Sequence, residues 1–207
     1  MRDVSACAWN MSKIRIVGVH HRHQMSIADV EDAIAEHKPD IVCVELPSDD
    51  YLKFLEVRSY LETEMKIAMV TACEIGAKVC LIDLTKEYIE RRLRETLRLK
   101  DPRLWLEFEN GDIPAFYRRL REVAPASIDR AKEVLLLDRE AAMAAKLLSL
   151  AEKYPGSRIL AVVGYSHKPA IEEFLKDRKK LSDILKNRGI LVDEPHFLDC
   201  EEVMIYS

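Results

Sequence analysis

The sequence lacks the features that mark a membrane-spanning or exported chain. No window approaches the ~18 consecutive apolar residues that a membrane helix needs, and the first ten residues show no basic segment followed by an apolar one. The five cysteines form no Cys-x-x-Cys pair, and three of them lie inside apolar runs, which is typical of buried free thiols in a reducing compartment. We therefore expect a cytoplasmic protein whose cysteines are unpaired: Cys7, Cys43, Cys73, Cys80 and Cys200.

An excess of positive charge is also missing. The formal net charge is -4 and the pI is near 5.9, which argues against nucleic acid or an anionic membrane surface as the main partner. A chain of 207 residues suits one compact domain with a well-formed core. We interpret residues 1–12 as an N-terminal tail, with Met11 as an alternative start, and residues 13–207 as that domain.

The chain does contain a strand-Gly-x-x-His pattern that occurs twice. Residues 158–167 read Arg-Ile-Leu-Ala-Val-Val-Gly-Tyr-Ser-His, and residues 14–21 read Ile-Arg-Ile-Val-Gly-Val-His-His. The apolar run 159–163 is too short for a free-standing helix, so it predicts a strand that is buried on both faces. His167 and His21 would then emerge just beyond the carboxyl ends of two strands, where open α/β sheets bind their ligands.

Strands and helices alternate along the rest of the chain. Strands are expected at 13–20, 41–44, 79–82 and 159–164, with an edge strand at 201–206. Helices are expected from an N-cap at Ser26 to before Pro39, and at 50–75, 86–100, 127–153 and 169–188. The segment 101–125 is interpreted as an irregular helical insertion, with a lid as the alternative. This alternation predicts an α/β fold in which a mostly parallel sheet carries helices on both faces.

Four of the predicted buried strands end in a polar residue that can bind a metal or move a proton. These residues are His21, Glu45, Asp83 and His167. If the four strands are parallel neighbours, their carboxyl ends converge, and two imidazoles and two carboxylates face one crevice. Two histidines and a carboxylate are a common ligand set for a divalent transition metal, which polarises a carbonyl group and lowers the pKa of its water. This pattern is typical of a hydrolase.

Each of these residues also has a structural interpretation. A strand-terminal acid such as Glu45 or Asp83 often caps the next helix or binds loop amides. The two histidines that flank His21 favour loop positions, and Asp138 with Arg139 favours a surface charge pair on a helix. One Gly-x-x-His would be weak evidence for a site, whereas its recurrence at two strand ends strengthens the functional interpretation.

With these motifs in place, the sequence resembles the TraB/PrgY/Tiki family over most of its length, from Ile14 to about Phe174. Gly18-Val19-His20-His21 and Gly164-Tyr165-Ser166-His167 look like the two GxxH signatures of that family. The run from Pro39 to Leu46 is similar to its Pro-Asp-apolar-Glu-Leu segment, and Glu64-Met65 leading to Gly76-Ala77-Lys78 is similar to its Glu-Met helix and Gly-Ala turn. Ile82-Asp83 with Arg92, and Asp138-Arg139-Glu140 with Met143-Ala144, resemble its Ile-Asp strand end, downstream arginine and acid-Arg-acid helix.

The resemblance implies a fold related to the erythromycin-esterase and ChaN-like group, and a metal-dependent peptidase activity of the Tiki type. It also singles out Glu64 and Arg139 as site residues. The chain departs from the family at Leu84 and Asp50, where many members have arginine, so less positive charge is expected at the mouth of the site. The membrane helices of PrgY-like members have no counterpart in this sequence, so pheromone shutdown at a membrane is not expected.

The resulting hypothesis is a metal-dependent hydrolase, most simply a peptidase. His21, Glu45 and His167 are expected to hold a divalent ion, either Mn, Co, Fe or Zn. Asp83 is expected to be a fourth ligand or an orienting acceptor behind the ligands. The expected partner is a peptide or small-molecule substrate, and the protein is compatible with a homodimer.

The same hypothesis gives catalytic roles to residues on helices. A carboxylate on an apolar helix face is costly to bury without a partner, so Glu64 is expected to pair with Arg92, Arg139 or the metal. The hypothesis further assigns Glu64 the role of general base that activates the water on the metal. Arg92 or Arg139 would steady the oxyanion, and Asp138 would belong to the same catalytic group.

Two alternatives stay open. In the first, the domain binds a peptide or small ligand without catalysis, and Arg92, Arg139, Glu64 and Glu45 form mutually satisfied ion pairs with no metal. In the second, the protein is a metal-independent esterase with a histidine as general base.

Overall fold

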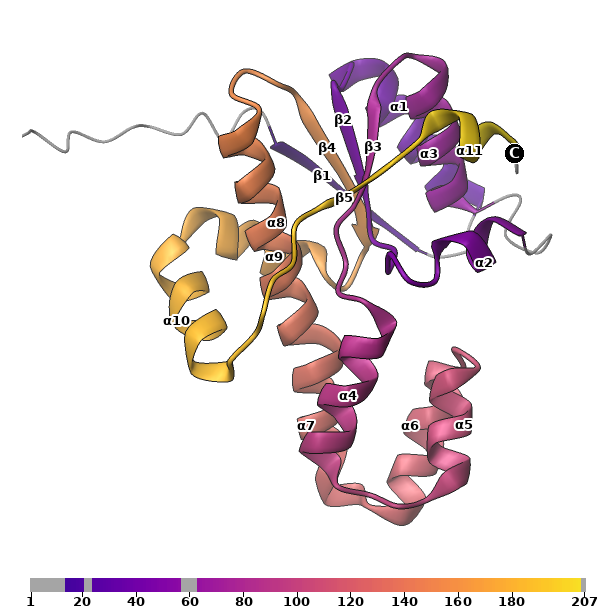
Figure 1. The fold of residues 1–207 in the computed structure, drawn as a ribbon, viewed down its shortest axis with the longest axis vertical. Helices are drawn as coiled ribbons and strands as arrows, with labels where there is room; N and C mark the ends of the chain where they lie inside the picture. Colours follow the sequence, from indigo (N-terminus) through magenta and orange to yellow (C-terminus); the bar gives the residue numbers. More distant parts are fainter. Residues whose placement is uncertain (1–13, 21–23, 57–62, 206–207) are drawn as a thin grey trace, which may run out of the picture.

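A five-stranded sheet forms the centre of the computed structural model, which describes residues 14–20, 24–56 and 63–205 (Figure 1). The strands are β1 (Ile14–Val19), β2 (Ile41–Val44), β3 (Lys78–Leu81), β4 (Ile159–Gly164) and β5 (His196–Leu198). Their order is β1-β4-β2-β3-β5; the first four are parallel, and β5 is antiparallel to β3. The predicted α/β class with a mostly parallel sheet is confirmed.

Alternating side chains of the strands pack into two cores, one on each face of the sheet. In β2, Ile41 and Cys43 belong to one core, whereas Val42 and Val44 belong to the other, and none of the four is more than 2% exposed. Strands β2 and β4 lie inside the sheet and are buried along their whole length. Burial on both faces explains why their sequences are unbroken apolar runs rather than alternating ones.

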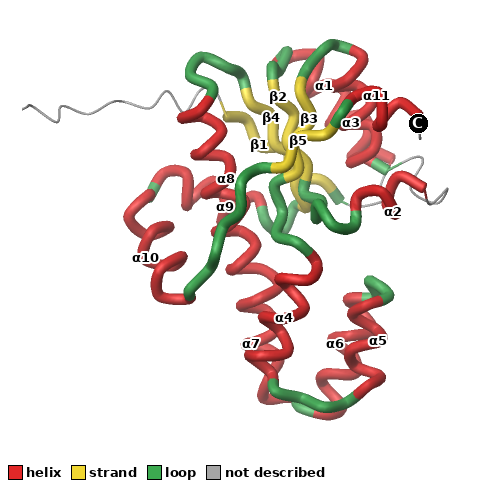
Figure 2. Tube along the Cα trace, viewed as in Figure 1, coloured by secondary structure: helices red, strands yellow, loops and turns green. Residues whose placement is uncertain are grey.

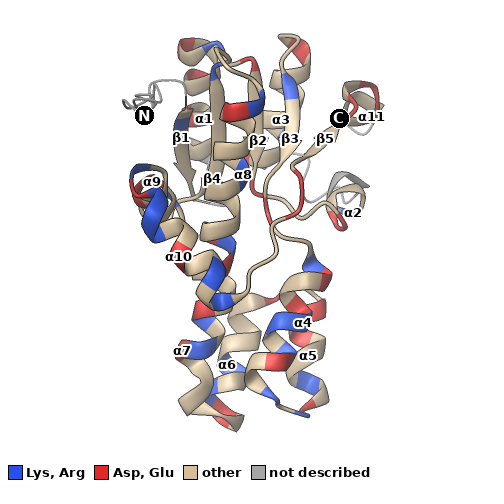
Figure 3. Cartoon of the chain, turned by 60° about the vertical axis from the view of Figure 1, so that its left-hand side comes forward, with Lys and Arg blue, Asp and Glu red and all other residues tan. Residues whose placement is uncertain are grey.

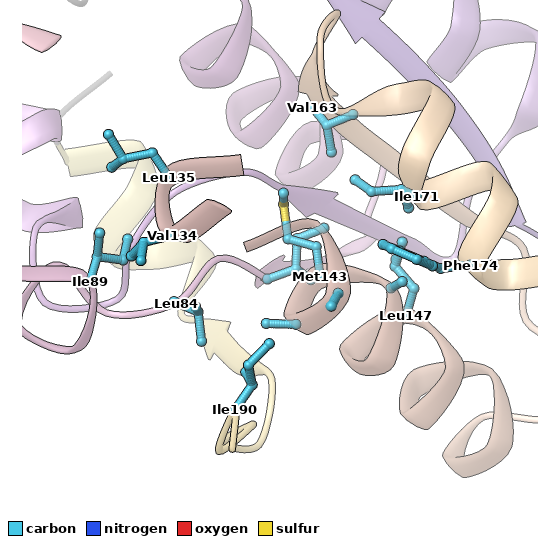
Figure 4. Close-up of a cluster of buried hydrophobic side chains, with 14 of the residues drawn as sticks. Leu84, Ile89, Val134, Leu135, Met143, Leu147, Val163, Ile171, Phe174 and Ile190 are labelled. Atoms are coloured by element: carbon cyan, nitrogen blue, oxygen red, sulfur yellow. The ribbon is translucent and has the colours of Figure 1, made fainter. Parts of the chain in front are cut away.

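Helices cover both faces of the sheet, as the red segments around the yellow strands show (Figure 2). The helices of one face are α1 (Gln24–His37), α3 (Glu64–Glu74) and α11 (Cys200–Ile205). Those of the other face are α8 (Arg139–Lys153) and α9 (Lys168–Lys176), against which α10 (Arg178–Arg188) packs. Figure 4 shows part of this second core, where Met143 and Leu147 of α8 lie among Val163, Ile171 and Phe174.

A group of further helices extends from the sheet beyond the end of β3 (Figure 1). These are α4 (Lys86–Leu97), α5 (Pro102–Glu109), α6 (Ile113–Val123) and α7 (Ile128–Lys132). The segment expected as a helical insertion is the α5–α6 hairpin. Asp101 caps α5 by accepting the Arg103 N–H (2.9 Å), and Asp112 caps α6 by accepting the Ala115 N–H (2.9 Å).

Residues of both charge signs are interspersed along these helices (Figure 3). On α4, Arg94 binds Glu90 one turn away (2.7 Å) and Glu109 of α5 (3.2 Å). The opposite side of α4 carries the predicted apolar seam, which is buried and consists of Ile89, Leu93 and Leu97. The charged face of this helix is therefore a surface with local ion pairs.

Several predicted element boundaries are wrong. The helix expected at 50–75 is replaced by α2 (Tyr51–Glu56) and α3, because Thr63 caps a new helix by accepting the Lys66 N–H (3.4 Å). The helix expected at 169–188 is divided into α9 and α10. Asp177 caps α10, because its side chain accepts a hydrogen bond from the Lys180 N–H (2.9 Å). Ser26 lies inside α1 rather than at its N-cap, and its hydroxyl group bonds to the backbone of His20 at 3.0 Å.

The C-terminal segment also differs from its prediction. The edge strand expected at 201–206 is the helix α11 over the described residues, and the edge strand is β5 instead. Asp199 explains the difference locally, because its side chain accepts the Glu201 N–H (2.9 Å) at the start of α11.

Two cysteines are joined in a disulfide. Cys73 of α3 is bonded to Cys200 of α11, so the expectation that all cysteines are unpaired is wrong for this pair. Cys43 and Cys80 are free and buried as predicted, and Cys7 lies outside the described residues. Disulfides are rare in reducing compartments, so this bond counts against the cytoplasmic prediction. In the described part of the chain, no helix is long and apolar enough to cross a membrane.

Candidate functional site

The carboxyl ends of four parallel strands meet at one edge of the sheet. The register pairs Val19 of β1 with Gly164 of β4, and Val44 of β2 with Val162 of β4. Glu45, Asp83 and His167 follow the ends of β2, β3 and β4, so they are brought to the same edge, as predicted. His21, the fourth predicted strand-end residue, lies outside the described residues.

The two Gly-x-x-His segments pack directly on each other. The Tyr165 N–H donates to the Val19 carbonyl (2.8 Å), and the Tyr165 ring stacks on His20 with centroids 4.7 Å apart. A Cβ added at Gly18 would lie 3.1 Å from Cδ of Lys168 and 3.3 Å from Cα of Tyr165. The first glycine of the repeat therefore permits close approach to the second copy.

His167 is held between two carboxylates. Its Nδ1 lies 3.0 Å from Oε1 of Glu140, and its Nε2 lies 3.3 Å from Oε1 of Glu45. Burial lowers the pKa of His167, but the hydrogen bonds to Glu140 and Glu45 outweigh this effect and raise the pKa to about 9. The imidazole is therefore charged at neutral pH when a proton is the only cation at this position.

Glu45 has three hydrogen-bond partners, and its side chain is only 4% exposed. Besides His167, Oε1 accepts from Nη2 of Arg139 (2.5 Å), and Oε2 accepts the Gly164 N–H (2.7 Å). Burial raises the pKa of Glu45, but Arg139, His167 and Gly164 together lower it to about 2. Glu45 is thus a buried anion at the centre of the strand ends.

Arg139 joins Glu45 to Asp83. Its Nη2 donates to Oδ2 of Asp83 (2.7 Å), and its Nε is 3.1 Å from Oδ1 of the same residue. A third contact runs from Nη1 to the Leu135 carbonyl (3.2 Å). Burial lowers the pKa of Arg139, but Asp83 and Glu45 raise it above its ordinary value, so the guanidinium stays charged. The planar fork of arginine suits two carboxylates at once.

Arg139 and Glu140 follow a π-helical turn, η4 (Glu133–Asp138). Such turns are rare and occur frequently at functional sites, because the extra residue changes the direction of the following side chains. Asp138 and Glu140 are buried, so the alternative interpretation of Asp138 and Arg139 as a surface charge pair is wrong. Glu140 reaches His167, whereas Asp138 binds Arg92 (3.2 Å) and Arg188.

A cavity of about 350 Å³ opens beside these charged groups. Glu45, Asp83 and Arg139 line one side of it, and Glu64 at the start of α3 lines it as well. Arg92 and Asp138 do not line this cavity; they form a separate, partly buried cluster with Arg188, in which Nη2 of Arg92 also binds the Arg188 carbonyl (2.9 Å). Of these six predicted site residues, the structure therefore brings four together around the cavity, and it places Arg92 and Asp138 elsewhere.

Comparisons with protein-family models, with curated proteins and with solved structures found no match for this chain. The functional argument therefore depends on the geometry of the side chains described above. Among the described residues, no group of three or more His, Cys, Asp or Glu is placed to hold a metal ion. The described part of the predicted ligand set is the pair His167 and Glu45.

Sequence reasoning missed two groups that support this site. Glu140 was visible only as part of the acid-Arg-acid run, yet it contacts His167 directly. Lys146, one of the most deeply buried side chains, donates to the Asp83 carbonyl (2.7 Å) and pairs with Asp193 (2.8 Å). The signal that could have identified Glu140 and Lys146 is their charge within the otherwise apolar segment 140–147, because a buried charge needs a partner.

Proposed function

We propose that this protein is a hydrolase that cleaves a peptide bond, and that it uses a divalent transition metal, either Mn, Co, Fe or Zn. The observation that carries the proposal is the position of His167 between Glu140 and Glu45, of which Glu45 also lines the cavity. A metal-binding histidine usually donates its second ring N–H to a carboxylate, backbone carbonyl or water, and Glu140 lies beside Nδ1 of His167 in the position of such an orienting group.

The donor set fits such an ion. With Glu140 on Nδ1 of His167, the other ring nitrogen faces Oε1 of Glu45 at 3.3 Å. The carboxylates that stabilise a proton on this imidazole would also stabilise a metal ion in its place. His21, which lies outside the described residues, is the proposed third ligand. Arg139 would stay on Glu45 and keep part of its charge compensated.

The remaining groups would act on the substrate. Glu64 and Glu45 line the same cavity, so Glu64 is the candidate general base for water in that cavity. Arg139 lines it too and is held rigidly by Asp83, which suits a donor to the developing oxyanion. A bound ion would supply Lewis-acid polarisation of the scissile carbonyl group. Arg92 and Asp138 are assigned no part in this mechanism.

Metal content is the direct test. Purified protein is loaded separately with Mn, Co, Fe or Zn, desalted and analysed by mass spectrometry of the metal, for wild type, His21→Ala, His167→Ala and a His196→Ala control. His196 is exposed on β5, against Tyr51. We expect about one ion per chain in wild type and in the control, and loss of the ion in the other two. Unchanged metal in both site variants would refute the ligand assignment.

Hydrolysis of a peptide library with and without a chelator completes the test. We expect cleavage that requires metal and is lost in Glu64→Gln, while His196→Ala cleaves like wild type. Cleavage that is insensitive to chelator would favour a metal-independent enzyme with His167 as base instead.

One observation favours a second candidate, a peptide- or small-ligand-binding site without catalysis. Arg139, Glu45 and Asp83 satisfy one another in the absence of an ion, as a non-catalytic polar cluster would require. Ligand binding without turnover and without metal uptake would select this alternative.

A further inference from the structure

The cavity has two walls of different chemistry. Glu45, Asp83 and Arg139 form the polar wall at the sheet edge. Asp50, Glu64 and Lys86 are further charged residues of the lining. The apolar wall includes Phe108 and Ile113, which flank the turn of the α5–α6 hairpin. Ile89, Leu135 and Met65 extend this apolar wall from α4, η4 and α3.

The apolar wall is a fixed part of the structure. Phe108 is 4% exposed and packs edge-on against Phe116 of α6, with ring centroids 5.8 Å apart. The hairpin turn is attached to α4 by Lys86, whose Nζ donates to the Glu109 carbonyl (2.8 Å). Ile113 is only partly buried, so it presents apolar surface that a ligand can cover.

The cations beside the cavity are already bound. Arg139 is held by Asp83 and Glu45, and Lys86 is held by the Glu109 carbonyl with Asp50 at 4.0 Å. A charged group of either sign on a ligand would therefore have to compete with these existing ion pairs. It would also lose hydration against the apolar wall, which is unfavourable unless a partner replaces the water.

We propose that the substrate carries an uncharged apolar side chain, branched aliphatic or aromatic, next to the bond that is cleaved, and that Phe108 and Ile113 of the hairpin bind it. This inference rests on the proposed function, because the bound molecule is a substrate only if the site is catalytic. Glu45 connects the two, since it lines the cavity and also contacts His167. A volume of about 350 Å³ lies at the small end of the range for ligand sites and suits one or two residues of a peptide.

Methyl NMR tests the inference without requiring turnover or metal. The probes are N-acetyl-leucinamide, N-acetyl-phenylalaninamide, N-acetyl-aspartate amide and N-acetyl-lysinamide, titrated into protein labelled at isoleucine and leucine methyl groups. We expect the first two to shift the signals of Ile113, Ile89 and Leu135, and the two charged probes to leave them in place. Ile113→Trp, which fills the cavity, should abolish the response of Ile89. The matched control is Leu106→Trp on the exposed side of α5, where the side chain is 54% exposed and lines no part of the cavity; it should keep the response.

The same selectivity should appear in catalysis. Peptides with Leu or Phe at the cleaved position should have kcat/KM values at least about tenfold above those with Asp or Lys, and Ile113→Trp should remove this preference. Equal methyl shifts with a charged probe, or an unchanged Ile89 response in Ile113→Trp, would overturn the inference. If the methyl shifts occur as expected but neither metal nor hydrolysis is found, the proposed function fails and the apolar binding wall stands.

Discussion

Replacing Arg139 by methionine should destabilise the protein by about 3–5 kcal/mol at neutral pH. The guanidinium contacts oxygens of Asp83 at 2.7 Å and Glu45 at 2.5 Å, and these two side chains are only 1% and 4% exposed. Methionine keeps much of the apolar stem but donates no hydrogen bond. Two buried carboxylates would then lose their shared counter-charge, which is the costly way to break a buried ion pair.

The size of this loss should depend on pH in one direction. Burial raises the pKa of Glu45, and Arg139 is the first of the groups that reverse this effect and lower the pKa from 4.5 to about 2. The folded-state pKa is lowered, so the stabilisation is complete above pH 4.5 and is lost as the pH falls towards 2. The difference in unfolding free energy between wild type and Arg139→Met should therefore be largest near neutral pH and should shrink in acid.

Urea unfolding followed by circular dichroism, in neutral and in acidic buffer, measures this difference. Arg119→Met is the matched control, because it removes an arginine from Asp101 at a similar distance (2.6 Å) but with side chains that are 31% and 19% exposed. The control should lose clearly less, since solvent screens the pair. Arg139→Lys should fall between, because it keeps the charge without the planar fork. Equal losses in Arg139→Met and Arg119→Met, or a loss that does not change with pH, would refute the reasoning.

Two further predictions concern stability. In metal-free protein, Glu140 and Glu45 overcome the effect of burial and raise the pKa of His167 to about 9, so about 3 kcal/mol of stability should be complete below pH 6.5 and lost as the pH rises through 9. Urea midpoints across this interval measure it; Glu140→Gln should flatten the profile, and a wild-type profile that is already flat would contradict it. Separately, Cys200→Ser should lower the unfolding free energy by about 4–5 kcal/mol, because the bond to Cys73 closes a loop over a separation of 127 residues. Reductant should destabilise wild type equally and leave the variant unchanged, whereas equal stability of oxidised and reduced wild type would contradict the prediction.

The sheet and the place of the site could be predicted from local sequence patterns. Unbroken apolar runs at 41–44 and 159–163 identify β2 and β4, because every side chain of a strand buried on both faces is removed from water. The rule that parallel strands present their carboxyl ends at one edge then places Glu45, Asp83 and His167 together. The α5 and α6 caps at Asp101 and Asp112 are equally local signals.

Helix ends were less predictable, because one polar residue can divide a continuous apolar pattern. Thr63 and Asp177 each start a new helix by accepting a backbone N–H, although the apolar spacing continues past both. The C-terminal segment shows a related effect, since Asp199 and the disulfide to Cys73 favour a helix where the residues themselves suit a strand.

The sequence by itself determined the α/β class, the four parallel strands and the edge of the sheet where polar residues gather. Only the tertiary structure decided which of those residues touch. Glu45 meets Gly164 across 119 positions of the chain, and Arg139 meets Asp83 across 56. Periodicity reports which face of an element is buried, but a contact between distant segments depends on strand order and on the turn that precedes each side chain. The insertion of β4 between β1 and β2, and the π-helical turn before Arg139, supplied these two conditions.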